Sequence, residues 1–325
     1  LQYVLQFIIL LLLKNYYVYL IVALAVQAGT NIVSAIVADR LYPHYKAQGE
    51  LDQVKRKEIN QRIKDLFTAK LGGTLVNSAD TIVISAFLGL TTLAIYQNYY
   101  YIMTSVIGIV SVIFNSCTAG IGNSLVTESV DKNYNDFRKL TFIICWISAI
   151  CVSCFASMYQ PFMEVWVGRD YMFNMSIVAL FCIYFYLYII NSVPVVYKEA
   201  GGIWHEDRFR PLVGALVNLG INLLFVKKYG VYAILLSTII SYLVVAMPWL
   251  IHNVFSVLFK RSSRNYVIEL FVYGGVTTAV TIATYIICSF VPFNGLLKVV
   301  CNCVICFVLT NVLLFIIYRR HEMLK

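Results

Sequence analysis

The sequence predicts an all-α, polytopic membrane protein with about ten transmembrane helices. Hydrophobic residues make up 60% of its 325 positions and charged residues only 13%, whereas a soluble domain carries about 25% charged residues. Apolar runs of about 20 residues, the length a helix needs to cross the hydrocarbon of a bilayer, recur along the chain. So much apolar surface cannot be hidden in the single core of a soluble domain, which excludes that class.

The charge and the cysteines do not indicate nucleic-acid binding, metal binding or a cofactor. The net charge of +9 comes from basic residues in loops beside the apolar runs. The nine cysteines lie almost entirely inside those runs, and Cys303 and Cys306 have CxxC spacing without a second pair or a nearby His. We therefore interpret the cysteines as small packed hydrophobes and expect neither a metal site nor a bound cofactor.

The first two crossings are expected to end at residue 13 and to run over residues 16–39, with Pro43 ending the second. The polar segment 46–65 that follows is either an interfacial amphipathic helix joining two halves of the protein or a solvated linker. The chain opens on Leu1 inside an apolar run, without a secretory signal pattern. We therefore expect that an N-terminal part of the protein is missing.

Residues 67–123 hold the third and fourth crossings, which carry the most informative polar residues. Lys70, Asn77 and Asp80 lie inside the third apolar run. An ionisable group there costs roughly 2.5–3.5 kcal/mol, so it usually faces a bundle interior or a water-filled path. A stripe containing Asn98 and Asn115 follows steps of three and four along the fourth crossing. We expect these two helices to form two walls of a central cavity.

Six further crossings are expected over residues 140–159, 175–197, 212–226, 231–255, 266–290 and 296–318. Nineteen of the 25 Lys and Arg residues lie in loops after even-numbered crossings or in the tail, against five on the other side and Lys70 within a crossing. The positive-inside rule therefore predicts a cytoplasmic C-terminus. The loops on the opposite side are short, which argues against an enzyme with an external catalytic domain.

Each polar residue in these crossings has two interpretations. Lys70 either snorkels to the cytoplasmic surface or pairs with an anionic substrate. Asp80 either makes a structural hydrogen bond to a neighbouring helix or couples transport to a cation or a proton. Asn98 and Asn115 belong to a stripe that either packs helices closely through its small residues or lines the substrate path. These four residues and Asn77 are the candidate substrate and ion-coupling residues.

Two other groups of polar residues have structural interpretations. Asn218 and Asn222 stand one helical turn apart inside the seventh crossing, and we expect them to form interhelical hydrogen bonds. The charged run from His205 to Arg210 lies in a loop. We expect it to form a solvated network.

Several runs resemble a known family. They read ADTIVISAFLGLTTLAIYQNYYYI, EVWVGRDY and YKEAGGIWHEDRFRPLVGALVNLGINLLFVKKYGVYAILLSTIIS. Together they are similar to the polysaccharide flippases of the O-antigen and capsule type, in the multidrug/oligosaccharidyl-lipid/polysaccharide exporter superfamily. The resemblance covers most of the chain, from residue 16 to the basic tail.

This resemblance implies a two-lobe, MATE-like transporter of 12 or 14 helices, with an incomplete N-lobe and roughly four helices missing here. Residues 1–42 would end the N-lobe, 43–66 would link the lobes, 67–258 would form the C-lobe, and 259–325 would be an appended pair of helices with a basic tail. The family moves undecaprenyl-pyrophosphate-linked oligosaccharides from the inner to the outer leaflet of the bacterial plasma membrane by alternating access. Lys70 would be its cavity cation, and a H⁺ or Na⁺ gradient is a candidate driving force.

The resemblance also defines partners and alternatives. Expected partners are the lipid-linked oligosaccharide and membrane lipids, with the polysaccharide polymerase machinery as a further candidate, and no nucleic acid. A drug/cation antiporter of the same superfamily would need acidic residues to dominate the cavity, and here only Asp80 is acidic in mid-membrane. A membrane glycosyltransferase or polymerase would need catalytic outer loops, and a non-transporting scaffold is the remaining alternative. We expect a transporter rather than an enzyme.

Overall fold

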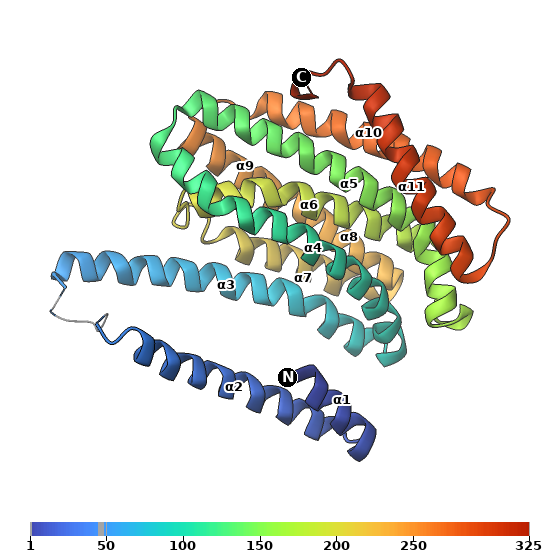
Figure 1. Cartoon of the computed structure of the whole chain (residues 1–325), viewed down its shortest axis with the longest axis horizontal. Helices are drawn as coiled ribbons and strands as arrows, with labels where there is room; N and C mark the ends of the chain where they lie inside the picture. Colours follow the sequence, from blue (N-terminus) through green and yellow to red (C-terminus); the bar gives the residue numbers. More distant parts are fainter. Residues whose placement is uncertain (1, 45–48, 50, 325) are drawn as a thin grey trace. The chain divides into compact units, whose positions relative to one another are not determined.

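The protein is all-helical, as the sequence predicts. The computed structural model describes residues 2–44, 49 and 51–324, without the side chains of 69, 75–77 and 324. Every regular element within these residues is a helix (Figure 1). Eight of the described helices are long and apolar enough to cross a membrane, which makes the chain a multi-pass membrane protein. They are Tyr16–Leu41, Leu90–Thr127, Val130–Trp166, Met175–Ala200, Arg210–Tyr229, Val231–Phe259, Arg264–Ser289 and Gly295–Tyr318.

The described chain divides into two compact units, residues 1–58 and 59–325. The first unit contains α1 (Gln2–Leu13) and α2 (Tyr16–Leu41), which pack together. Asn15 caps α2, because its side-chain oxygen accepts hydrogen bonds from the backbone N–H groups of Tyr17 and Val18 at 2.9 and 3.3 Å. α1 is apolar, but with 12 residues it is too short to cross a bilayer as a straight helix.

One helix, α3 (Gln53–Phe87), contains both the predicted amphipathic segment and the predicted third crossing. The boundary expected near residue 66 therefore falls inside a continuous helix. The sequence allows this continuity because residues 53–71 contain neither Pro nor Gly. α3 is not among the eight candidate spans of the described chain, and its division between a linker and a lobe stays a prediction.

Two helices form the centre of the second unit. They are α5 (Val130–Trp166) and α6 (Met175–Ala200), which bury more side chains than the helices around them. α4 (Leu90–Thr127) packs on both, and a buried aromatic cluster fills the space between them and their neighbours. Phe137 and Tyr197, for example, meet edge to face with ring centroids 5.0 Å apart.

The predicted seventh and eighth crossings form a helical hairpin. α7 (Arg210–Tyr229) ends at Gly230, whose φ of +55° allows the tight turn into α8 (Val231–Ser241). A π-helical turn, Tyr242–Ala246 (η2), then leads into α9 (Met247–Val254). Pro248 lies just after this π turn. Because proline cannot donate the helical hydrogen bond, the wider turn before it lets the helix continue.

The last two crossings pack against α5. A second π turn, Phe255–Phe259 (η3), ends α9, and α10 (Arg264–Ser289) and α11 (Gly295–Tyr318) follow. Arg138 on α5 donates to Glu269 on α10 at 2.6 Å, and Trp146 on α5 donates to the Asn311 side chain on α11 at 2.9 Å. In Figure 1 these two helices, coloured orange and red, lie beside the green α5. Two 3₁₀ turns, η1 (Arg169–Tyr171) and η4 (Glu322–Leu324), complete the fold.

Candidate functional site

The Asp80 carboxylate joins three helices. On one oxygen it accepts a hydrogen bond from the Asn222 amide of α7, at 2.9 Å. On the other it accepts one from the Thr238 hydroxyl of α8, at 3.2 Å. Both donors are neutral, and no ion pair joins Asp80 to a cation among the described residues. Asp80 is therefore a partly buried carboxylate stabilised by neutral donors alone.

Behind Asp80, a network of buried amides and hydroxyls connects α7 and α8. The Asn218 amide donates to Ser237 and Thr238 at 3.2 and 2.9 Å, and Ser237 donates to the Asn222 side-chain oxygen at 2.6 Å. Asn218 and Asn222 are 1% and 0% exposed. The predicted interhelical hydrogen bonds of these two asparagines are thus confirmed. Such partners are needed, because an unpaired polar group in a bundle interior costs about 1–3 kcal/mol.

The hydrogen bonds to Asp80 leave its charge incompletely compensated. The Thr238 hydroxyl has a single proton, and the Ile234 carbonyl, at 3.1 Å, competes with Asp80 for it. An ionised carboxylate can accept about four hydrogen bonds, and here it has one unshared donor and one shared donor. The geometry therefore suits a carboxylate that takes up a proton or a small cation.

A small cavity of about 20 Å³ lies next to Asp80. Its lining includes Thr81, Gln97 and Thr238, together with three tyrosines, Tyr96, Tyr100 and Tyr184. A cavity must have an accessible volume of at least about 10–15 Å³ to hold one water molecule. The space beside Asp80 can therefore hold one water or one ion of similar size, but no larger group.

The structure does not bring the other predicted site residues to Asp80. Lys70 is exposed, and ten residues before Asp80 on α3 it stands about 15 Å away along the helix axis. Asn98 is half-buried and Asn115 is exposed, both on α4. The side chain of Asn77 lies outside the described residues. Whether these residues line a substrate path stays a prediction.

A second polar site, fifteen residues before Asp80 on α3, was not predicted. Asp65 is 5% exposed, and its carboxylate lies 3.0 Å from Nδ1 of His205 and 3.3 Å from the Arg208 guanidinium. Burial by itself raises the pKa of Asp65, but the hydrogen bonds from His205, Arg208 and Gln61 and the positive charge of Arg208 outweigh it, so that this pKa lies below its usual value. This cluster fastens α3 to the loop between α6 and α7.

The same loop is less solvated than its charge suggests. Asp207 is 1% exposed and accepts hydrogen bonds from Arg210 at 2.6 and 2.8 Å, while the buried Lys198 lies 3.5 Å from it. The expectation of a solvated network is therefore wrong for Asp207. Its charge is buried because two cations compensate it, and the spacing of residues in the loop gave no signal of this burial.

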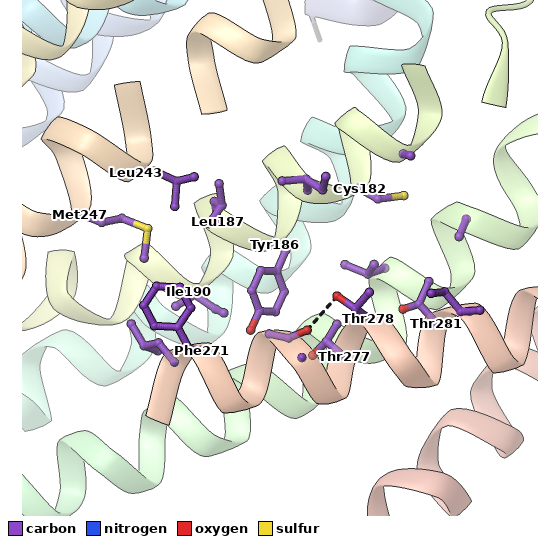
Figure 2. Close-up of a pocket in the computed structure, with 18 of the residues that line it drawn as sticks. Cys182, Tyr186, Leu187, Ile190, Leu243, Met247, Phe271, Thr277, Thr278 and Thr281 are labelled. Atoms are coloured by element: carbon purple, nitrogen blue, oxygen red, sulfur yellow. Dashed lines mark hydrogen bonds between the residues drawn. The ribbon is translucent and has the colours of Figure 1, made fainter. Parts of the chain in front are cut away.

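A larger cavity lies elsewhere in the described chain. It has a volume of about 730 Å³ and is bounded by α5, α6, the segment from η2 to α9, and α10. Figure 2 shows its wall, with Leu187 and Ile190 on α6 opposite Phe271 and Thr278 on α10. None of the predicted site residues lines it. No local sequence pattern indicates this cavity.

The Asp80 site thus offers a carboxylate, neutral donors and room for one small ion within a multi-pass helical bundle. This arrangement can bind and release a proton or a cation. Comparison of the chain with protein-family models, with curated proteins and with solved structures found no match.

Proposed function

We propose that the chain belongs to an ion-coupled membrane transporter that flips lipid-linked oligosaccharides from the inner to the outer leaflet of the bacterial plasma membrane. The observation that carries the coupling is the Asp80 carboxylate, which has neutral donors from two other helices and no cation partner among the described residues. The eight candidate spans supply the multi-pass framework that such a transporter needs.

Charge compensation is the physical reason for coupling. A carboxylate withdrawn from water and stabilised only by neutral donors is favoured once a proton or a cation joins it. Asp80 contacts α7 and α8 as well as lying on α3, so occupancy of this site changes the attraction among three helices. A ligand that binds one arrangement of these helices more tightly shifts the protein toward it.

The oligosaccharide substrate rests on the sequence resemblance to polysaccharide flippases. A pyrophosphate cannot cross hydrocarbon unaided, so the protein must offer it a polar path, while the polyprenyl tail stays in the lipid. Lys70 and the α4 face containing Asn115 are exposed within residues 59–325 and are available to such a path. Rocking of one lobe against the other would move the site from one side to the other, with the C-terminus in the cytoplasm.

The test uses the full-length protein in liposomes that carry a fluorescent polyprenyl-pyrophosphate oligosaccharide, with a pH or sodium gradient imposed. We expect leaflet exchange above that of protein-free vesicles, accelerated by one of the gradients. Asp80→Asn should remove the response to the gradient, and Lys70→Ala should lower the flux without lowering membrane insertion. Asp170→Asn, at an exposed aspartate in η1, is the matched control. A gradient response that survives Asp80→Asn contradicts the coupling role.

The second candidate function is drug/cation antiport. The tyrosine rings around the cavity beside Asp80 favour it, because aromatic faces attract organic cations. The cavity of about 20 Å³ disfavours it, because a lipophilic cation needs far more space. Export of a lipophilic dye by the same liposomes, without oligosaccharide exchange, would select this function over the first.

A further inference from the structure

Two cavities of opposite character meet in the second unit. The apolar cavity of about 730 Å³ and a polar cavity of about 260 Å³ share three lining residues, Ala156, Met175 and Tyr285. Along α10 the lining is mostly apolar as far as Tyr285, apart from the hydroxyls of Thr277, Thr278 and Thr281, and continues into the polar cavity through Cys288 and Ser289. The two spaces therefore form one amphipathic site.

The apolar cavity is a groove that runs along α10. Its α10 wall extends from Ser263 to Tyr285, which is roughly 33 Å at 1.5 Å per residue and close to the ~30 Å thickness of bilayer hydrocarbon. A volume of about 730 Å³ spread over this length gives a narrow space. Its shape fits an extended hydrocarbon chain rather than a compact ligand. Phe271, Leu187 and Ile190 give it apolar walls (Figure 2).

The polar cavity contains a buried amide with an unused acceptor. Asn302 on α11 is 1% exposed, and its amide nitrogen donates to the Ser157 carbonyl at 3.0 Å. This contact requires a donor, so it fixes the orientation of the amide and leaves the oxygen without a partner among the described residues. A buried amide oxygen without a partner is stabilised by an N–H or O–H donor, which a ligand can supply.

The charge of the polar cavity comes from Lys298. Its side chain is half-buried and makes no ion pair with any described residue. Glu164, also in the lining, is already paired with Arg169 at 2.6 Å, and Gln160 is engaged with Tyr99 and the Phe173 carbonyl. The lining therefore offers a cation at Lys298 and an unused acceptor at Asn302, which complement an anion and a hydrogen-bond donor on the same ligand, beside the unpartnered Ser157 hydroxyl.

We propose that this site binds phosphatidylethanolamine from the surrounding bilayer. One acyl chain lies in the α10 groove, the phosphate pairs with Lys298, and the ammonium group donates a hydrogen bond to the Asn302 oxygen. A phosphate and a primary ammonium on one headgroup match Lys298 and the Asn302 oxygen, and the attached chain matches the groove. The site shares no lining residue with the cavity beside Asp80, so it does not depend on the proposed transport function.

The test measures lipid retention by the full-length protein. The protein is delipidated in detergent, incubated with equal amounts of phosphatidylethanolamine and phosphatidylcholine of identical chains, and analysed by native mass spectrometry. Phosphatidylcholine carries the same phosphate but lacks N–H donors. We expect phosphatidylethanolamine to be retained about tenfold better, the effect of one charge-assisted hydrogen bond. Equal retention of the two lipids overturns the headgroup assignment.

Two variants with matched controls locate the site. Lys298→Gln removes the charge at similar length, and Thr278→Phe fills the groove from an exposed position on its wall. Each should lower retention about tenfold. The controls are Lys228→Gln and Val272→Phe, at a lysine and an exposed α10 residue outside both linings, and they should retain the lipid.

A phosphatidylethanolamine with a photoreactive acyl chain gives an independent readout. Crosslinks should map to the groove walls on α6 and α10 in the unmodified protein and be lost in Thr278→Phe. Crosslinks spread evenly over lipid-facing helices, or unchanged by Thr278→Phe, contradict the proposal.

Discussion

Gly72 on α3 lies against the backbone of Leu212 on α7, so closely that a methyl group on Gly72 would be 2.7 Å from the Leu212 amide nitrogen. The carbonyl carbon and the Cβ of Pro211 are also within 3 Å of this position. A backbone cannot move aside as a flexible side chain does. Gly72 therefore permits the approach of α3 to α7, eight residues before Asp80 contacts the same helix.

This contact predicts that Gly72→Ala separates α3 from α7. We expect the free energy of unfolding to fall by about 1–3 kcal/mol, as for other overpacked contacts, and any gradient-driven flux to fall with it. Gly73→Ala is the matched control, because a Cβ there meets nothing within 4 Å. It should leave stability unchanged or raise it by up to about 1 kcal/mol, since alanine favours a helix over glycine. Detergent-induced unfolding of both variants measures the difference.

Asn222→Leu removes the amide donor to Asp80, together with the contacts of that amide to Asn218 and Ser237. We expect a loss of about 1.5–3 kcal/mol of stability, because hydrogen bonds to charged groups contribute about that much. Adding Asp80→Asn to this variant should recover part of the loss by removing the uncompensated carboxylate. Thermal unfolding in detergent ranks the stabilities of the single variant, the double variant and the unmodified protein. Asn123→Leu, at an exposed position of α4, is the control. If the double variant is no more stable than Asn222→Leu, the charge of Asp80 is not what Asn222 stabilises.

Arg138 and Glu269 connect α5 and α10 by two hydrogen bonds, at 2.6 and 3.3 Å, with about a quarter of each side chain exposed. Removing either partner leaves a partly buried charge, so each single change to Met should cost about 1–2 kcal/mol. The double change to Met should cost less than the sum of the two. A double-mutant cycle on unfolding free energy measures this coupling. Strictly additive losses would contradict a direct interaction.

Asp65 predicts a specific pH dependence of stability. Its folded-state pKa lies below the usual value of 3.8, because the hydrogen bonds from His205 and Arg208 outweigh the effect of burial. The unfolded chain therefore binds a proton at Asp65 more readily than the folded chain does. The contribution of Asp65 is fully present above the usual carboxyl pKa and is lost as the pH falls through the lowered folded pKa.

The variant Asp65→Asn tests the predicted direction of this pH dependence of stability. Its melting temperature should lie below that of the unmodified protein at pH 7, and the gap should close as the pH is lowered below about 4. Asp170→Asn, at an exposed aspartate, should show a much smaller gap at every pH. A gap that stays constant between pH 7 and pH 3 would exclude the carboxylate charge as the source.

The sequence by itself determined the class of the protein and showed which of its polar residues lie inside apolar runs. Apolar runs of bilayer length indicate most of the helices locally, so the all-α, multi-pass architecture could be predicted, although α1 and α3 are not among the eight candidate spans of the described chain. The one-turn spacing of Asn218 and Asn222 inside such a run implied hydrogen-bond partners on another helix, because an unpaired amide in that setting is costly. Likewise, Asp80 could be singled out from its position in an apolar run alone.

Only the tertiary structure decided which helices supply the partners. Asp80 meets Asn222 and Thr238 across more than 140 positions, and Asp65 meets His205 across 140. Periodicity fixes the face of a helix on which a residue lies, but not the helix against which that face packs. The groove along α10 and the buried Asp207 follow from how neighbouring helices fit together. That fit depends on the shapes of side chains far apart in the sequence, which no local pattern records.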